Sequence, residues 1–420
     1  MRKQSVSGAV HIPESRFMNN QNRFYKSSLH IRRESMRKNL SIICAVLLVI
    51  SFAACSKKSN AQKAGETVTL NFATAGDTNM LEFFQNYIGP AFNAKYPNIK
   101  INVVGTGPGD DGSRNIYTKW KAQADAKRTE WDIDAACVNE SIMKDMIENN
   151  IIAQYVPQIS NARYVNTPSS EFCLGTNVKG YVVPMFKSQI VLAYNPEKVR
   201  NPPKSFNDLE AWITANPRKF GYNGVVGGMS GVGFTAAWLY AKTGDYNTIA
   251  NGPYSTETTQ KWPDIIRSLK ALPVVYTQGN AGTLDMLNRG EIDIGPVWVD
   301  MLLLWKSDGR MNPNIRMLLP DPGMPGQPMY LVVGQNAKNG EAARLWCDFI
   351  ADPAVQAEFV VGKYTWYPGV DPTAVFEKCS EESKQLLFSE VTAEEIAVKG
   401  LSLPLSDYMR DMQKMYAEIR

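Results

Sequence analysis

Two side chains with ligand-binding chemistry, Trp298 and Asp300, lie at the end of an apolar segment. The run from Ile292 to Val299 predicts a strand, and positions two apart on a strand share one face. An indole face beside a carboxylate suits an ammonium group through cation–π attraction and charge pairing, and it suits a sugar through stacking and hydroxyl bonds. A core tryptophan beside a surface aspartate is the structural alternative. Glu140, just after the apolar segment that ends at Val138, has the same placement and the same two interpretations.

Two glycine-rich segments precede predicted helices. Residues 107–112 read GPGDDG, a literal GxGxxG pattern after a strand. Asp110 and Asp111 would repel a pyrophosphate where helix N–H groups should attract it, so a turn or a cleft-lining loop is favoured over a nucleotide site. Residues 227–233 read GGMSGVG, whose backbone N–H groups could hold a ligand oxygen or carboxylate; close packing of the helix is the alternative. No lysine follows in the Walker position.

The charge and histidine distribution excludes several classes of chemistry. Residues 1–54 hold nine basic and two acidic side chains together with both histidines, His11 and His30. The remaining chain has 36 basic and 39 acidic residues and no histidine. If the segment is removed, Ser/His/Asp triads, Cys/His pairs and His-bound metals are excluded. No basic excess is left to attract nucleic acid.

The sequence from Met36 to Cys55 predicts a targeting segment. Arg37 and Lys38 precede an apolar core that is too short for a comfortable membrane span, as in a secretory signal peptide. The residues Phe-Ala-Ala-Cys at 52–55 resemble a bacterial lipobox, in which Cys55 would receive diacylglycerol. An ordinary cleaved signal is the alternative. We therefore expect residues 1–54 to be leader and signal peptide with Met36 as the true start, residues 55–66 to be a polar tether, and the protein to be exported and lipid-anchored, facing the periplasm or cell exterior.

Strands alternate with helices after the tether. Residues 68–73, 99–103 and 131–138 read as strands, and helical patterns cover residues 80–92, 115–127 and 141–149. This order predicts parallel βαβ units with a ligand site at the carboxyl ends of the strands. Further on, residues 181–184 and 190–194 read as two strands separated by 185–189, residues 317–319 and 330–333 flank a proline-rich loop, and Ser205 is a candidate helix N-cap.

Several segments, in order, resemble the family-1 extracellular solute-binding proteins of ABC importers. They are Tyr96-Pro97-Asn98-Ile99, Leu192-Ala193-Tyr194-Asn195, Pro203 to Leu209, Asn288 to Gly295, and Asn336-Ala337-Lys338-Asn339 with Asp352-Pro353. The resemblance implies an α/β fold with two lobes, each a mainly parallel sheet flanked by helices, joined by two crossing hinge segments. We place lobe 1 at 67–185 plus 328–368, lobe 2 at 186–327, the crossings near 184–189 and 319–330, and a helical segment at 369–420.

The resemblance also implies a non-catalytic receptor whose ligand lies between the lobes. The expected ligand-binding residues are Asp77, Asp111, Glu140, Lys187, Gly231, Trp298, Asp300, Tyr330 and Trp366, the last within the aromatic run 364–367. The expected partners are a small polar solute, either a polyamine-like cation or a carbohydrate, and the subunits of an ABC permease. We expect a monomer without metal, cofactor or nucleic acid.

Two other function classes remain open. The carboxylate pairs Asp132/Asp134 and Glu291/Asp293 could suggest a surface glycosidase, but neither pair has an evident partner at catalytic distance. The fold could also serve as a sensor or adhesin. Four cysteines, Cys137, Cys173, Cys347 and Cys379, follow the tether and allow three disulfide pairings. Cys137 and Cys347 lie in apolar runs, which favours buried free thiols.

Overall fold

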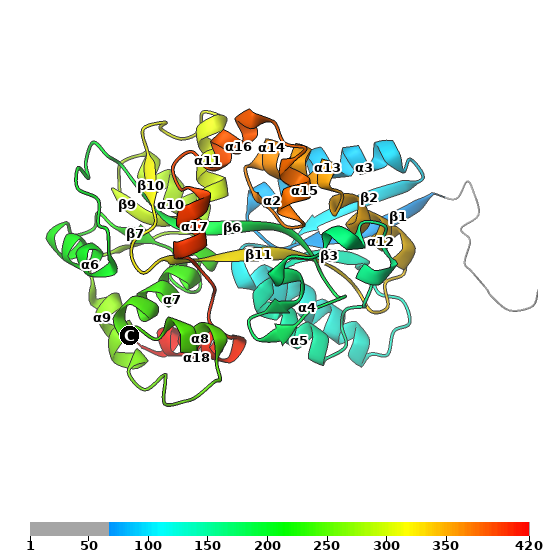
Figure 1. Cartoon of the computed structure of the whole chain (residues 1–420). Helices are drawn as coiled ribbons and strands as arrows, with labels where there is room; N and C mark the ends of the chain where they lie inside the picture. The colour runs from blue at the N-terminus through cyan, green and yellow to red at the C-terminus, as the bar shows by residue number, and fades with distance from the viewer. Residues whose placement is uncertain (1–66, 420) are drawn as a thin grey trace, which may run out of the picture. The chain divides into compact units, whose positions relative to one another are not determined.

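The first lobe is built on a parallel sheet, as the alternation of strands and helices predicts. The computed structural model describes residues 67–419; the leader, the lipobox cysteine Cys55 and the tether lie outside the described residues. Strand β1 pairs in parallel with both β2 and β3 (Figure 1). The elements are β1 (Val68–Thr74), α2 (Thr78–Phe83), η2 (Phe84–Ile88), α3 (Gly89–Lys95), β2 (Ile99–Gly105), α4 (Gly109–Asp125), β3 (Ala135–Asn139), η3 (Glu140–Ile142) and α5 (Met143–Glu148).

Strand β3 is shorter than the sequence predicts, because Asp134 does not take part in a ladder. Its buried carboxylate accepts hydrogen bonds from the backbone N–H groups of Asn71 and Asn339 at 2.9 and 2.7 Å. Asp132 is exposed and forms an ion pair with Arg128 at 2.9 Å. These two carboxylates therefore do not act as a pair.

Two long antiparallel strands, β6 (Val183–Tyr194) and β11 (Met324–Val333), cross from one lobe to the other (Figure 1). Strand β11 pairs with β3 in the first lobe, and β6 pairs with β9 (Ile294–Trp298) and β10 (Arg316–Leu318) in the second. The prediction of strand–loop–strand connections here was wrong. The backbone of Lys187, Ser188 and Gln189 pairs with β11, so this segment is part of the ladder. The Gln189 side-chain amide also donates to the Met324 carbonyl at 2.7 Å.

The second lobe surrounds one helix that is buried on nearly every side, α7 (Met229–Thr243). It begins five residues earlier than predicted, because the glycine-rich segment forms its first turn. Ser205 caps α6 as expected, in a capping box with Asp208. The other elements are α6 (Phe206–Ala215), β7 (Gly221–Tyr222), α8 (Tyr246–Asn251), α9 (Trp262–Ala271), β8 (Val275–Tyr276), α10 (Gly279–Asn288) and α11 (Val299–Ser307).

Trp298 and Asp300 do not share a strand face. Strand β9 ends at Trp298, which is the N-cap of α11, and Asp300 lies in the first turn of that helix. The predicted strand through Val299 was wrong, because apolar residues continue from the strand into the helix with Asp300 as the one interruption between Val297 and Leu304. The carboxyl end of the strand still lies at the junction of the two lobes.

The C-terminal segment is mostly helical and contacts both lobes. Strand β13 pairs with β11, and α18 packs on α7 and α9. Lys144 of α5 also forms an ion pair with Asp407 of α18 at 3.1 Å. The segment is thus a third connection between the lobes. Its elements, with those that precede it, are α12 (Gly340–Ile350), α13 (Pro353–Val355), η7 (Gln356–Val361), α14 (Gly362–Tyr364), β12 (Tyr367–Pro368), α15 (Pro372–Phe376), α16 (Glu381–Leu387), α17 (Ala393–Lys399), β13 (Gly400–Leu401) and α18 (Ser406–Glu418).

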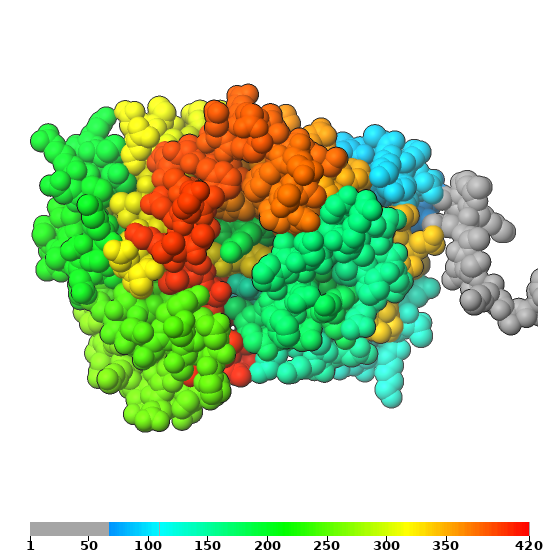
Figure 2. Space-filling model, viewed as in Figure 1, coloured from blue at the N-terminus to red at the C-terminus, as the bar shows by residue number. Residues whose placement is uncertain are grey.

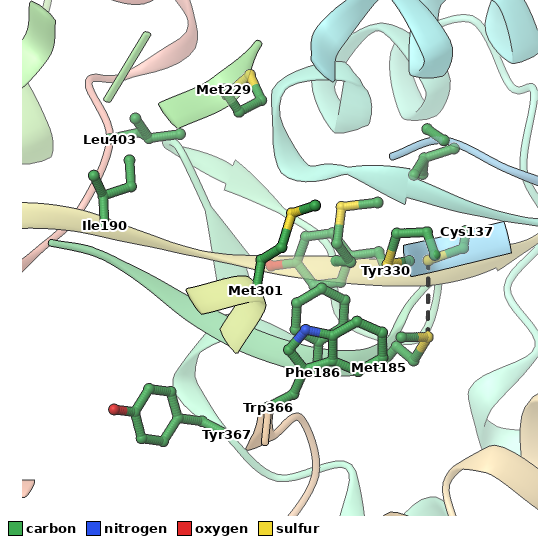
Figure 3. Close-up of a cluster of buried hydrophobic side chains, with 14 of the residues drawn as sticks. Cys137, Met185, Phe186, Ile190, Met229, Met301, Tyr330, Trp366, Tyr367 and Leu403 are labelled. Carbon is green, nitrogen blue, oxygen red and sulfur yellow. Dashed lines mark hydrogen bonds between the residues drawn. The ribbon is translucent and has the colours of Figure 1, made fainter. Parts of the chain in front are cut away.

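The cysteines after the tether are free thiols. Cys137 and Cys347 are buried, which confirms the expectation from their apolar surroundings, and Cys173 is buried as well. The Cys137 thiol lies 3.9 Å from the Met185 sulfur (Figure 3). None of the described helices combines the length and the apolar character that a membrane span requires. Within residues 67–419, no three His, Cys, Asp or Glu side chains are grouped closely enough to hold a metal ion.

Candidate functional site

A cavity of about 80 Å³, here called the front cavity, lies where the two lobes and the crossing strands meet. Its walls come from the carboxyl ends of strands and the first turns of helices, as the fold class predicts. The first lobe contributes Gly76, Asp77, Asn79, Met80, Pro108 and Asn139; the crossing strands contribute Phe186, Ser188, Gln327 and Met329; the second lobe contributes Asn223, Gly227, Gly228, Met229, Ser230, Gly279, Asn280, Trp298, Asp300 and Met301.

Asp77 brings a carboxylate from the first lobe up to the second. It is the N-cap of α2, and one carboxylate oxygen accepts the backbone N–H of Thr78 at 2.8 Å. The other oxygen approaches Gly279, which begins α10 with a φ of +65°: a Cβ there would lie only 3.4 Å from it. Asp77 therefore lies at the front cavity and close to the opposite lobe.

Asp300 is a buried carboxylate at the cavity wall, with 4% of its surface exposed. The Ser188 hydroxyl donates a hydrogen bond to the Asp300 carboxylate. The Trp366 indole N–H donates a second one at 2.5 Å. Burial raises the pKa of Asp300 to about 6, although these two hydrogen bonds act to lower it. Among the described residues, no lysine or arginine forms an ion pair with Asp300. The site thus holds a buried negative charge without a counter-ion.

Most of the remaining wall is apolar and rich in sulfur. Four methionines line the cavity together with Phe186 and Trp298: Met80, Met229, Met301 and Met329. Figure 3 shows Met229, Met301 and Phe186. Thioether side chains are flexible and polarisable, so they adapt to the shape of an alkyl group. Sequence reasoning missed these methionines because a methionine beside a helix start is indistinguishable from a core residue in a single sequence.

Three amide side chains add unused hydrogen-bonding capacity. The Asn139 side-chain N–H₂ group and the side-chain carbonyls of Asn223 and Gln327 have no partner within the described part of the chain. They supply one donor group and two acceptors, which suits a ligand that carries a few polar atoms.

The structure brings three of the expected ligand-binding residues together, because Asp77, Trp298 and Asp300 all line the front cavity. Glu140 and Lys187 line a different cavity. Asp111 lies in a surface depression beside Asp110 and Arg114. The structure places these last three outside the front cavity.

The other three expected residues are buried parts of the framework. Gly231 packs α7 against the preceding loop, since a Cβ there would lie 1.8 Å from the Gly224 carbonyl oxygen. Tyr330 is fully buried, and its hydroxyl donates to the Ser169 carbonyl at 2.6 Å. Trp366 is also fully buried, stacks on Phe186 with ring centroids 4.2 Å apart, and holds Asp300 in place (Figure 3).

Comparison with known proteins identifies the family. A family model described as "Bacterial extracellular solute-binding protein" matches residues 77–357. The chain belongs to this family. Its members are non-catalytic receptors of the kind used by ABC importers. No curated protein matches the sequence.

Solved structures of solute-binding proteins share the fold at low sequence identity. Maltose-bound MalE3 of T. maritima superposes with a TM-score of 0.65 and 15% identity, covering 84% of this chain and 95% of that one. The spermidine/putrescine ABC transporter substrate-binding protein PotD of Streptococcus pneumoniae superposes with a TM-score of 0.59 and 15% identity, and the match covers 84% of this chain and 100% of that one. Iron-bound HitA of Pseudomonas aeruginosa superposes with a TM-score of 0.61 and 16% identity, and the match covers 84% of this chain and 99% of that one. Such likeness establishes the two-lobed α/β periplasmic-binding-protein fold.

Proposed function

We propose that this solute-binding protein takes up a small organic cation in the front cavity, closes its lobes around it, and delivers it to an ABC import permease. The observation that carries the proposal is the charge of the cavity wall. Asp77 and Asp300 are acidic, and none of the residues that line the front cavity is basic. A bound cation would supply the counter-ion that Asp300 lacks.

The energetics of a buried carboxylate support this choice of ligand charge. An unpaired charge in a poorly solvated site is unfavourable, and an opposite charge within about 4–6 Å restores the ionised form. A neutral ligand would leave Asp300 uncompensated, and an anion would add repulsion. An ammonium group between the two carboxylates would satisfy both.

The apolar wall supports a cation with a hydrocarbon body. Trp298 offers an indole face for cation–π contact, and the four methionines offer thioethers to methylene or methyl groups. A carbohydrate is the second candidate, favoured by Trp298 and the unpaired amide groups of Asn139, Asn223 and Gln327. A sugar would, however, bury many hydroxyl groups against methionine side chains that are poor hydrogen-bond partners.

The comparisons are compatible with either solute class, because structures of the same fold bear the names of a spermidine/putrescine transporter and of a maltose-bound protein. The acidic side chains of the front cavity favour a polyamine-like solute over a carbohydrate. The same comparisons include several ABC transporter components, which supports an ABC permease as the partner.

We propose further that the mature protein begins at Cys55 and is anchored by lipid on the outer face of a membrane. The support is the lipobox-like sequence at 52–55 behind a basic and apolar segment. Two or more acyl chains would give stable anchoring, since each buried methylene contributes about 0.8 kcal/mol. Mass spectrometry of the N-terminal peptide tests this; an unmodified N-terminus would contradict it.

Titration calorimetry with matched cationic and neutral ligands tests the solute class. Putrescine should be compared with 1,4-butanediol and choline with its neutral carbon analogue, with maltose as the carbohydrate arm. We expect at least one cation to bind and its neutral counterpart to bind at least about tenfold more weakly. Asp77→Asn should weaken binding of the cation, whereas Glu171→Gln, at a residue that does not line the front cavity, should not. Equal binding of the neutral partner, or binding of maltose alone, would overturn the cation assignment.

A further inference from the structure

A second and larger cavity, here called the rear cavity, lies on the other face of the crossing strands. Its volume is about 570 Å³. Side chains alternate between the faces of a strand, and the lining residues follow this rule: Ser188 and Gln327 face the front cavity, whereas Lys187 and Pro328 face the rear cavity. Figure 2 shows a hollow at this place, bounded by the C-terminal segment in red, the helices in orange and the teal loop of the first lobe.

The walls of the rear cavity come from three parts of the chain. The first lobe supplies the loop 167–175, the second lobe supplies Ala250 and Asn251, and the C-terminal segment supplies Ser402 and Leu403. Five prolines make much of the surface rigid and apolar: Pro168, Pro184, Pro328, Pro368 and Pro372. The cavity is therefore a built feature of the described chain.

A buried carboxylate without a partner faces this cavity. Glu140 follows β3 and is only 6% exposed, and its Oε1 atom has no hydrogen-bond partner among residues 67–419. Burial raises the pKa of Glu140 to about 8, against the effect of the nearby Lys187 charge, which lowers it. An unsatisfied buried carboxylate is unfavourable and needs an explanation.

An ammonium group without a partner faces the same cavity. Lys187 projects from β6, and its surface is accessible to solvent although the protein encloses it, as expected for a side chain inside a cavity. Within the described chain it forms neither an ion pair nor a hydrogen bond. Burial lowers the pKa of Lys187 and Glu140 raises it, so the two charges interact across the cavity without forming a salt bridge.

The other charged residue of the wall already has a partner. Glu171 forms an ion pair with Lys179 at 2.7 Å. The rear cavity therefore presents one unpaired carboxylate and one unpaired ammonium group. A ligand with a single charged group would pair with one of these two side chains and leave the other without a partner.

We propose that the rear cavity binds a small zwitterion, whose ammonium group pairs with Glu140 and whose carboxylate pairs with Lys187. Thr167, Ser169 and Ser402 also line the rear cavity and offer hydroxyl groups to the remaining polar atoms of the ligand. This site is separate from the front cavity, although Phe186 borders both. Its existence does not depend on which solute the front cavity takes.

Calorimetry on the purified full chain tests the proposal. The ligands are ω-amino acids from glycine to 6-aminohexanoate, a ruler series in which the distance between the ammonium and carboxylate groups increases. We expect one chain length to bind best, and the amine and the carboxylate of the same length to bind at least about tenfold more weakly. Glu140→Gln and Lys187→Met should each weaken the best zwitterion at least about tenfold. Asp77→Asn, in the front cavity, should leave its affinity unchanged.

Three outcomes would overturn the proposal. The first is that no ω-amino acid gives saturable binding, which would mean that Glu140 and Lys187 pair with each other or with water. The second is that the matched amine binds as tightly as the zwitterion. The third is that Asp77→Asn abolishes binding while Lys187→Met preserves it, which would place the ligand in the front cavity. If Lys187→Met fails to fold, the ruler series on the wild-type and Asp77→Asn chains still decides, because it needs no change in the rear cavity.

Discussion

Replacing Asp300 with asparagine should stabilise the ligand-free protein and weaken its function. The folded chain holds this carboxyl with a pKa of about 6 rather than 3.8, so folding opposes its ionisation. A difference of about 2 pKa units corresponds to about 3 kcal/mol at neutral pH. Asparagine removes the buried charge, can still accept the Trp366 indole N–H, and can donate to the Ser188 hydroxyl. We therefore expect Asp300→Asn to raise the free energy of unfolding by up to about 3 kcal/mol at pH 7.

The pH dependence of this gain distinguishes the electrostatic cause from a change in packing. Below pH 3.8 the carboxyl is neutral in both the folded and the unfolded states, so wild type and variant should be nearly equal in stability. Between pH 3.8 and about 6 the unfolded state ionises first, and the stability of the wild type falls relative to the variant. Above about pH 6 the difference should be constant.

Urea unfolding of both chains at several pH values from 4 to 8 measures the effect. Asp132→Asn is a matched control, because Asp132 is exposed and its ion pair with Arg128 should contribute no more than about 1 kcal/mol. The same Asp300→Asn protein should bind the cation more weakly by about 1.5–3 kcal/mol, the range for a charge-assisted hydrogen bond. An Asp300→Asn chain that is less stable at every pH, or whose gain does not change with pH, would refute the reasoning.

Four other outcomes are expected. The affinity for the cation should fall as the pH drops below about 6, because Asp300 of the free protein then takes up a proton; calorimetry at pH 5 and 7 measures this. Trp298→Ala should weaken cation binding by about 0.5–2 kcal/mol in the same assay. Gly231→Ala should destabilise the second lobe by about 2 kcal/mol or more in thermal unfolding, since its Cβ would overlap the Gly224 carbonyl, whereas Gly105→Ala, with only ordinary contacts, should change stability by less. Small-angle scattering should give a smaller radius of gyration with the cation than without it, and an unchanged radius would contradict closure of the lobes.

The sequence predicted the fold well where local pattern and global position agree. Hydrophobic periodicity predicted the alternation of strands and helices in the first lobe. The residue type at position 205 predicted the N-cap of α6. The crossing strands could not be predicted in this way, because Lys187, Ser188 and Gln189 are polar and a single sequence does not show that their backbone groups pair with β11. Polar residues within a strand resemble a loop until their hydrogen bonds are known.

The site was harder to predict for a geometric reason. Asp77, Trp298 and Asp300 lie at strand ends, where the fold class places ligand contacts. Glu140 also follows a strand, but the registry of β6 and β11 puts it and Lys187 on the rear face. Which face of a crossing strand meets which lobe depends on the packing of both lobes, and no spacing along the chain encodes it.

The third connection between the lobes also determines when the chain can fold. The first lobe needs β11 beside β3, and the second lobe needs α18 against α7 and α9. Lys144 can form its ion pair with Asp407 only after a further 263 residues have been synthesised. Both lobes are thus completed by contacts between residues that lie far apart in the sequence, and such contacts slow folding. A nonsense mutation before α18 would remove the helix that packs on α7 and α9, and the buried residues of the second lobe would lose that cover.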